Sequence, residues 1–341
     1  GSEMCIRDSR WSADYYGGGM VYLASLIEAE RAHNPNALLF DAGDTFQGNS
    51  FAYFFKDRSD NPIAGGMNFL DFDAMVVGNH EFNFGPATFD TMLSQVDFPI
   101  LGTANMDDDG SYGFINDNIE DYINLNVNGK KLTILGITNP RIYRYELPTN
   151  IPGLTFYPAV DTAVDMVPDI IAAEDPDLFL GLTHVGYAPY GGEVDSDLLI
   201  AENVAGLDVI IGGHSHTLLD PAEMVSSDIN PDGTLIAHAR RYAGYLGQVN
   251  VGWIGDEIVL REGFLLPTSE ATPDPELEAY LAPYDAEIVA YNETVIGSTE
   301  VPIDALEAYT QETNGANLQA DAAFFELLVQ EGVTIDAHLS G

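Results

Sequence analysis

The feature that most constrains the fold is a recurring pattern, in which a short apolar segment is followed at once by polar side chains. The apolar segments are residues 37–40, 74–77, 178–183 and 209–211, and the sequences after them are DAGD, GNHE, H and GGHSH. Such segments, separated by helical patterns, are typical of buried strands in an α/β fold. The sequence therefore predicts a layered α/β fold with polar side chains at the carboxyl ends of its strands, the edge where such sheets bind ligands.

Other segments add helices and hairpins to this layout. Apolar residues with helical spacing cover residues 21–33 and 161–173. Asn128-Gly129 lies between two apolar strands and predicts a type I′ turn. A second hairpin is predicted over residues 246–260. Because hairpins pair antiparallel, we expect mixed rather than purely parallel sheets.

The charge balance excludes one class of partner. The 341 residues include 12 Lys and Arg against 54 Asp and Glu, a formal net charge of −42. This acidity repels nucleic-acid backbones and anionic lipids, so we expect no nucleic-acid polymer as a partner. No apolar run reaches the roughly 20 residues of a membrane-spanning helix. The single cysteine, Cys5, excludes an internal disulfide. The sequence makes no prediction about the oligomeric state.

A group of polar residues follows directly on the predicted strands. Four of the seven histidines belong to this group. Imidazole, carboxylate and amide oxygen together suit Zn²⁺ or Mn²⁺ rather than Ca²⁺. The candidate metal-ligating and catalytic residues are Asp44, Asn79, His80, His184, His214 and His216.

Local spacing supports a site at these positions. In Gly-His214-Ser-His216, alternate residues after a strand project the same way, so both imidazoles can face one cavity. Glycine at these turns lets the backbone approach a metal or phosphate closely. The glycines expected to do so are Gly43, Gly78, Gly212 and Gly213.

These motifs, in this order, resemble the calcineurin-like metallophosphoesterases, and within them the 5′-nucleotidase family. The resemblance rests on GDTFQG, GNHEF, an isolated TH and GGHSH, and extends to GGMVYLASLI, ILGTANM, LTHVGY and Ala243–Gly247. It implies a layered α-β-β-α sandwich with mixed sheets, followed by the start of a second α/β domain. The form NHEFN is similar to the 2′,3′-cyclic-nucleotide 2′-phosphodiesterase/3′-nucleotidase branch.

The resemblance also implies roles for the candidate residues. In that family two divalent ions, such as Zn, Mn or Co, lie about 3.5–4 Å apart and share a bridging carboxylate. Asp44 would be the bridge, Asn79, His184 and His214 would complete one metal site, and His216 would serve the other. His80 would contact the phosphate or the leaving group, and Asn79 would also bind the substrate. Asn83 takes the place of an aspartate that orients the histidine in many relatives.

The resemblance covers the chain unevenly. We expect a non-native leader over residues 1–10, the phosphoesterase domain over 11–267, a linker helix over 268–299 and a truncated second domain over 300–341. The family's opening strand carries Asp-x-His, and the sequence before Gly19 has no such motif. We therefore expect this polypeptide to bind one metal well at best and to be a poor catalyst.

The function predicted from these features is two-metal hydrolysis of nucleotide phosphate esters by an exported enzyme, located in the periplasm, at the cell surface or outside the cell. Alternatives on the same fold are a cyclic-nucleotide phosphodiesterase, a nucleotide-sugar hydrolase and a thiohydrolase. An alternative of another class is a catalytically impaired metal-binding fragment.

Further residues invite functional interpretations that we judge weaker. His33 and His338 are expected to bind nothing. For His238, lining the site is the weaker of two interpretations, and a structural role is the stronger one. Arg240-Arg241 are expected to face solvent. Phe324-Phe325 have helical neighbours and are expected to pack in a core rather than stack on a base.

Overall fold

The computed structural model describes residues 19–48, 50–189, 194–308 and 310–326. Contacts divide the chain into two units, Gly1–Ile288 and Val289–Gly341, and each is described by itself. The predicted leader over residues 1–10 and His338 lie outside the described residues. Within the described residues, no helix has both the length and the apolar character needed to cross a membrane.

The larger sheet of the first unit has six strands. They are β5 (Tyr122–Val127), β6 (Lys130–Ile137), β8 (Leu178–Thr183), β9 (Val209–Gly212), β10 (Glu223–Val225) and β11 (Thr234–His238). Their order is β10-β11-β9-β8-β6-β5, with parallel pairing from β11 to β6 and antiparallel pairing at both edges. Asn128 and Gly129 have φ of 54° and 81°, as the predicted type I′ turn requires. The expectation of a mixed sheet is confirmed.

Smaller sheets form the second β layer. Strands β1 (Phe40–Asp41), β2 (Ala74–Val76) and β3 (Ile100–Leu101) pair in parallel. β12 (Tyr245–Ile254) and β13 (Glu257–Pro267) form a long antiparallel hairpin, as predicted, and β4 (Met106–Asp108) pairs with β7 (Leu154–Phe156). The strand predicted over residues 37–40 corresponds to β1, which contains only Phe40 and Asp41. The observed strand is therefore shorter than predicted and begins later in the chain.

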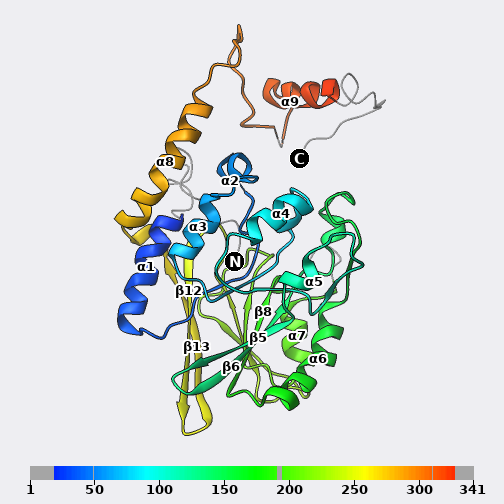
Figure 1. Cartoon of the computed structure of the whole chain (residues 1–341), viewed down its shortest axis with the longest axis vertical. Coiled ribbons are helices and arrows are strands. Elements are labelled where there is room, and N and C mark those ends of the chain that lie inside the picture. Colours follow the sequence, from blue (N-terminus) through cyan, green and yellow to red (C-terminus); the bar gives the residue numbers. More distant parts are fainter. Residues whose placement is uncertain (1–18, 49, 190–193, 309, 327–341) are drawn as a thin grey trace. The chain divides into compact units, whose positions relative to one another are not determined.

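Helices cover both outer faces of these sheets (Figure 1). α6 (Ala159–Glu174) and α7 (Asp197–Asn203) pack on one face of the six-stranded sheet, where Val167 and Ile200 join Phe179 in one apolar cluster. A second cluster, with Val76 and Leu180, lies between the sheets. A third places helix side chains against Met75 of β2. The remaining elements of the first unit are α1 (Met20–His33), α2 (Ser50–Phe55), α3 (Pro62–Phe69), α4 (Pro86–Leu93), α5 (Ile115–Asn118), η1 (His80–Phe82), η2 (Ile142–Arg144), η3 (Thr268–Glu270) and α8 (Pro275–Asn292), which runs past its end. The α-β-β-α sandwich is confirmed.

The C-terminal part differs from its prediction in two details. The helix expected over residues 268–299 is α8, which is shorter, and the boundary between the two units falls within it, after Ile288. The second unit contains α9 (Asn314–Phe325), whose first turn is capped by Thr313 Oγ1 accepting from Ala316 N at 3.2 Å. Phe324 and Phe325 are 42% and 54% exposed, so the prediction of core packing is wrong for the described residues, where α9 buries no side chain.

Candidate metal centre

Four of the predicted ligands meet where β1, β2, β8 and β9 end. Ligand atoms of Asp44, His184 and His214 all lie within 4.8 Å of one another. Asn79 joins them, because its Oδ1 lies 2.9 Å from His214 Nδ1. Asp44, His214 and His216 have positive φ of 64°, 71° and 54°, a backbone conformation that is uncommon outside glycine. Strained residues of this kind cluster at functional sites, at a cost of about 1–3 kcal/mol each.

Asp44 and His184 form the buried centre of the group. Asp44 Oδ2 lies 2.9 Å from His184 Nε2, and Asp44 Oδ1 accepts the backbone N–H of His80 at 2.8 Å. Burial alone would raise the pKa of Asp44, but His184 and His80 outweigh it, so the net shift is downward. Burial opposes protonation of His184, and the charge of Asp44 outweighs it and raises the pKa of the imidazole. The Asp44 carboxylate is therefore ionised and favours positive charge at this point of the site.

Three of the predicted glycines leave room for this pair. A Cβ on Gly43 or Gly213 would lie 2.9 Å from His184 Nδ1, and one on Gly78 would lie 2.4 Å from Asp44 Oδ1. Gly43 also has φ of +88°, which favours glycine. Close approach of the backbone, predicted from the turns, therefore occurs around the His184 ring.

Glu81 fastens the loops that bear Asp44 and Asn79. Its Oε2 accepts from Asp44 N at 2.9 Å and from Gly78 N at 2.7 Å, and its Oε1 accepts from Thr45 N at 2.7 Å and Phe46 N at 3.2 Å. Burial, together with the charge of Asp44, raises the pKa of Glu81. Glu81 was not among the predicted site residues, although the GNHEF motif contains it.

A path of side chains holds the imidazole of His80. Its Nδ1 lies 2.6 Å from Asn83 Oδ1, and Asn83 Nδ2 donates in turn to Glu146 Oε1. Asn150 Nδ2 donates to the other oxygen of Glu146 at 3.1 Å. The contact predicted between Asn83 and His80 is therefore present. Glu146, 63 residues further along the chain, carries no motif that could have revealed it.

His216 lies outside the group of three ligands. Its Nδ1 is 3.4 Å from Arg241 Nη1, and its ring is 6.0 Å from that of Tyr242. Burial and the charge of Arg241 lower the pKa of His216 to about 4, so the ring is neutral at pH 7. Arg241 therefore faces a predicted ligand rather than solvent alone. Tyr145, also missed by the sequence analysis, places its hydroxyl 3.4 Å from His214 Nε2.

His238 supports the strand before His184. Its Nε2 lies 2.7 Å from Asp197 Oδ2, and Asp197 Oδ1 accepts from Thr183 Oγ1 at 2.6 Å. A Cβ on Gly212 would lie 2.1 Å from Asp197 Oδ2, so this glycine makes room for the pair rather than for His184. His33 Nδ1 donates to the backbone oxygen of Ala29 at 2.8 Å, one helical turn earlier.

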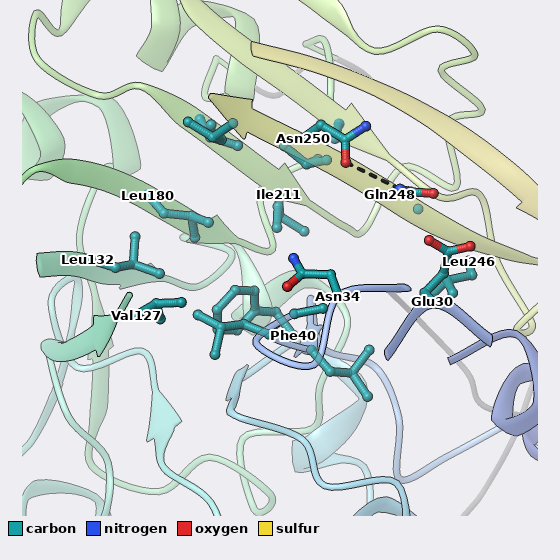
Figure 2. Close-up of a pocket in the computed structure, with 18 of the residues that line it drawn as sticks. Glu30, Asn34, Phe40, Val127, Leu132, Leu180, Ile211, Leu246, Gln248 and Asn250 are labelled. Atoms are coloured by element: carbon teal, nitrogen blue, oxygen red, sulfur yellow. Dashed lines mark hydrogen bonds between the residues drawn. The ribbon is translucent and has the colours of Figure 1, made fainter. Parts of the chain in front are cut away.

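A cavity of about 740 Å³ lies beside β1, and it is distinct from the metal centre. None of the six predicted ligand or catalytic residues lines it. Figure 2 shows side chains from two layers around it, among them Phe40 of β1, Leu180 of β8 and Ile211 of β9. Gln248 and Asn250 of β12 line another side and are hydrogen-bonded to each other at 3.2 Å (Figure 2).

The donor set fits a divalent metal ion. His184 Nδ1 faces the carbonyl of Ala42 at 2.5 Å, and a carbonyl only accepts, so in the neutral ring the lone pair is on Nε2. That nitrogen has no partner of hydrogen-bonding geometry among the described residues, despite its 2.9 Å distance from Asp44. A buried nitrogen without a partner is costly. A metal coordinated by Nε2, with a backbone carbonyl fixing the tautomer, removes that cost.

Known proteins resemble this chain in sequence. The sequence profile of the calcineurin-like phosphoesterases matches residues 16–218. The trifunctional nucleotide phosphoesterase YfkN of Bacillus subtilis is 30% identical in an alignment that covers 86% of this chain and 21% of that protein. The snake venom 5′-nucleotidase of Naja atra is 30% identical in an alignment that covers 96% of this chain and 63% of that one.

Solved structures agree with the sequence matches. A 5′-nucleotidase precursor from Thermus thermophilus superposes with a TM-score of 0.72 at 26% identity, covering 93% of this chain and 62% of that one. The chain thus spans less than two thirds of the length of each of these relatives. The profile match covers more than half of its 341 residues, and the fold agrees with it. The chain therefore belongs to the calcineurin-like phosphoesterase family.

Proposed function

We propose that this chain hydrolyses phosphate esters of nucleotides, using divalent metal ions held around Asp44. The observation that carries the proposal is the convergence of Asp44, His184 and His214, with ligand atoms within 4.8 Å of one another, beside the backbone N–H of His80. Asn79 adds an amide oxygen to the same group. These donors suit Zn²⁺, Mn²⁺ or Co²⁺.

Asp44, Asn79, His184 and His214 would hold one ion, and His216 would help to hold a second. When bound, such ions neutralise the charge on the phosphoryl oxygens and lower the pKa of water. Asn83 holds Nδ1 of His80, and when the imidazole is protonated its Nε2–H would donate a hydrogen bond to a phosphoryl oxygen or a proton to the leaving oxygen.

The substrate class is inferred from relatives. YfkN is named a nucleotide phosphoesterase, and the Thermus and Naja atra proteins are named 5′-nucleotidases. We infer a nucleotide or a related small phosphate ester as the substrate, and export as the setting, since one relative is a venom protein. Cyclic nucleotides, nucleotide sugars and thiosulfate esters are the competing substrates.

The test is product formation by the purified chain, stripped of metal and reloaded with Zn²⁺, Mn²⁺ or Co²⁺. The panel contains 5′-AMP and 3′-AMP, assayed by phosphate release, and 2′,3′-cyclic AMP, UDP-glucose and a thiosulfate ester, whose products are separated by chromatography. A second version of the chain, preceded by a strand bearing Asp-x-His, is assayed in parallel. We expect faster hydrolysis by the version with the Asp-x-His strand, and a nucleotide monophosphate as the best substrate of both versions.

The variant His80→Ala separates catalysis from metal binding. Because His80 contacts Asp44 through its backbone N–H, the substitution keeps that contact and removes the imidazole. We expect its kcat to fall by about 10²–10⁴-fold, as for loss of a general acid, with metal content unchanged. If neither version of the chain hydrolyses any substrate while both bind metal, the chain is a metal-binding module and the proposal fails.

A further inference from the structure

The side chain of His80 is connected to a buried carboxylate through an asparagine. His80 Nδ1 lies 2.6 Å from Asn83 Oδ1, and Asn83 Nδ2 donates to Glu146 Oε1. Asn83 follows η1, whereas Glu146 lies just beyond η2, on the segment after β6. Two parts of the chain distant in sequence thus meet behind the imidazole.

Glu146 fixes the order of hydrogen-bond donors and acceptors along the path from His80 through Asn83 to Glu146. An amide presents an oxygen on one side and NH₂ on the other, and the two sides have nearly the same shape. An ionised carboxylate only accepts, so Glu146 requires the NH₂ of Asn83 to face it. The amide oxygen of Asn83 must then face His80, and because this oxygen only accepts, His80 Nδ1 must carry the hydrogen.

The reverse arrangement is disfavoured by the same carboxylate. If the Asn83 amide were turned over, its oxygen would oppose an oxygen of Glu146, and its NH₂ would face His80 Nδ1. The imidazole would then carry its hydrogen on Nε2. The orientation of the Asn83 amide, and with it the tautomer that His80 favours, therefore depends on Glu146.

Glu146 is itself held in place from a third direction. Asn150 Nδ2 donates to Glu146 Oε2 at 3.1 Å and to the backbone oxygen of Asn83 at 3.0 Å. Ile142, four residues before Glu146, is fully buried and anchors η2. Glu146 is buried, with 8% of the residue exposed, and burial raises its pKa while the amides of Asn150 and Asn83 and the charge of His80 oppose that shift.

We propose that Glu146 is a positioning residue for the reaction, which acts by orienting the Asn83 amide and so fixes His80 with its hydrogen on Nδ1 and its Nε2 directed to the substrate. The inference rests on the proposed role of His80 in phosphate ester hydrolysis. In this arrangement a carboxylate supports the histidine indirectly, through Asn83. Many relatives were expected to have an aspartate in direct contact with the histidine instead.

Exchanging the amide at position 83 and the carboxylate at position 146 tests this assignment. Glu146→Gln leaves two amides, so the orientation of Asn83 is no longer fixed, and we expect kcat/KM to fall about tenfold, within the range for residues that orient catalytic groups. Asn83→Asp in that background restores one carboxylate and one amide. The new carboxylate at position 83 would accept from His80 Nδ1, and the new amide at position 146 would donate its NH₂ hydrogen to that carboxylate.

We therefore expect Asn83→Asp/Glu146→Gln to recover kcat/KM to within about threefold of the unsubstituted chain, with KM unchanged. If Glu146 only braces its segment, the second substitution cannot repair the first, and a double variant as slow as Glu146→Gln overturns the proposal. Glu223→Gln is the matched control, since Glu223 is an exposed carboxylate that accepts from the Tyr187 hydroxyl. It should leave kcat/KM unchanged.

A spectroscopic readout makes the inference independent of activity. ¹⁵N–¹H correlation spectra of the histidine rings, recorded near pH 8, where an imidazole with its usual pKa of about 6.5 is neutral, report which nitrogen carries the hydrogen. The His80 signals are identified by their loss in His80→Ala. We expect an Nδ1–H ring in the unsubstituted and double variants and a mixture in Glu146→Gln. An unchanged His80 signal in Glu146→Gln refutes the role of Glu146, whereas the expected signals without phosphate release refute the proposed function instead.

Discussion

The two halves of the candidate centre are fixed in different ways. The metal-binding half, around Asp44 and His184, is held by backbone groups: Glu81 accepts four backbone N–H groups, and glycines pack against the His184 ring. The other half, His80, is held by side chains, in the path through Asn83 to Glu146. Metal coordination needs several donors at one point, whereas the histidine needs a fixed orientation and tautomer.

This difference predicts different consequences of substitution. Backbone N–H groups cannot be replaced by a second change in sequence, so loss of their acceptor should damage folding and metal binding together. A path through side chains can be rebuilt from other side chains, so damage to the His80 half should be repairable and should affect mainly the rate. The following variants test that contrast.

Glu81→Leu should have the largest effect. It leaves four buried N–H groups without their acceptor, and each costs about 1–3 kcal/mol, so we expect the free energy of unfolding to fall by about 4 kcal/mol or more. Urea denaturation of the metal-free chain measures the loss. Glu223→Leu, at an exposed position, should change stability by less than about 0.5 kcal/mol. Equal losses in the two variants would mean that Glu81 does not hold these loops.

Gly78→Ala should have an intermediate effect. Its Cβ would lie 2.4 Å from Asp44 Oδ1 and 2.6 Å from Asp44 N, so the ligand must move, at a cost of about 1–3 kcal/mol. We expect a lower melting temperature and a lower metal content after dialysis against Zn²⁺. Gly297→Ala is the control, because nothing lies within 4 Å of its Cβ. Full metal content in Gly78→Ala would show that the centre tolerates displacement of its main chain.

The sequence predicted the metal-binding half better than the His80 half for a physical reason. Asp44, Asn79, His184 and His214 each lie within three residues of the end of a strand, so the parallel sheets bring them together once the strands are placed. The function of Glu146 depends on how the segment after β6 folds back, which no local periodicity encodes. Glu81 could have been found, because a carboxylate inside GNHEF, between two ligand loops, has few other roles open to it.

Sheet edges were the other limit of the sequence analysis. The apolar run at residues 37–40 predicted a longer strand than the two-residue β1. β1 ends its sheet on the side of the 740 Å³ cavity, where Phe40 is among the lining residues (Figure 2). An apolar run reports burial but not how many hydrogen-bonding neighbours a strand has, so strand length at an edge was not predictable from it.

Tyr145→Phe should have the smallest effect and sharpens the contrast between the halves. The Tyr145 hydroxyl is 3.4 Å from His214 Nε2, a long contact, and its ring stacks edge-on at 5.4 Å from the imidazole. Because phenylalanine keeps the ring, we expect metal affinity to change by less than about threefold, the equivalent of the 0.5 kcal/mol typical of changes that leave packing intact. Isothermal titration with Zn²⁺ measures it. A tenfold or larger loss would mean that the metal-binding half also depends on a side-chain contact from the segment that carries Glu146, and the two halves would then be one coupled unit.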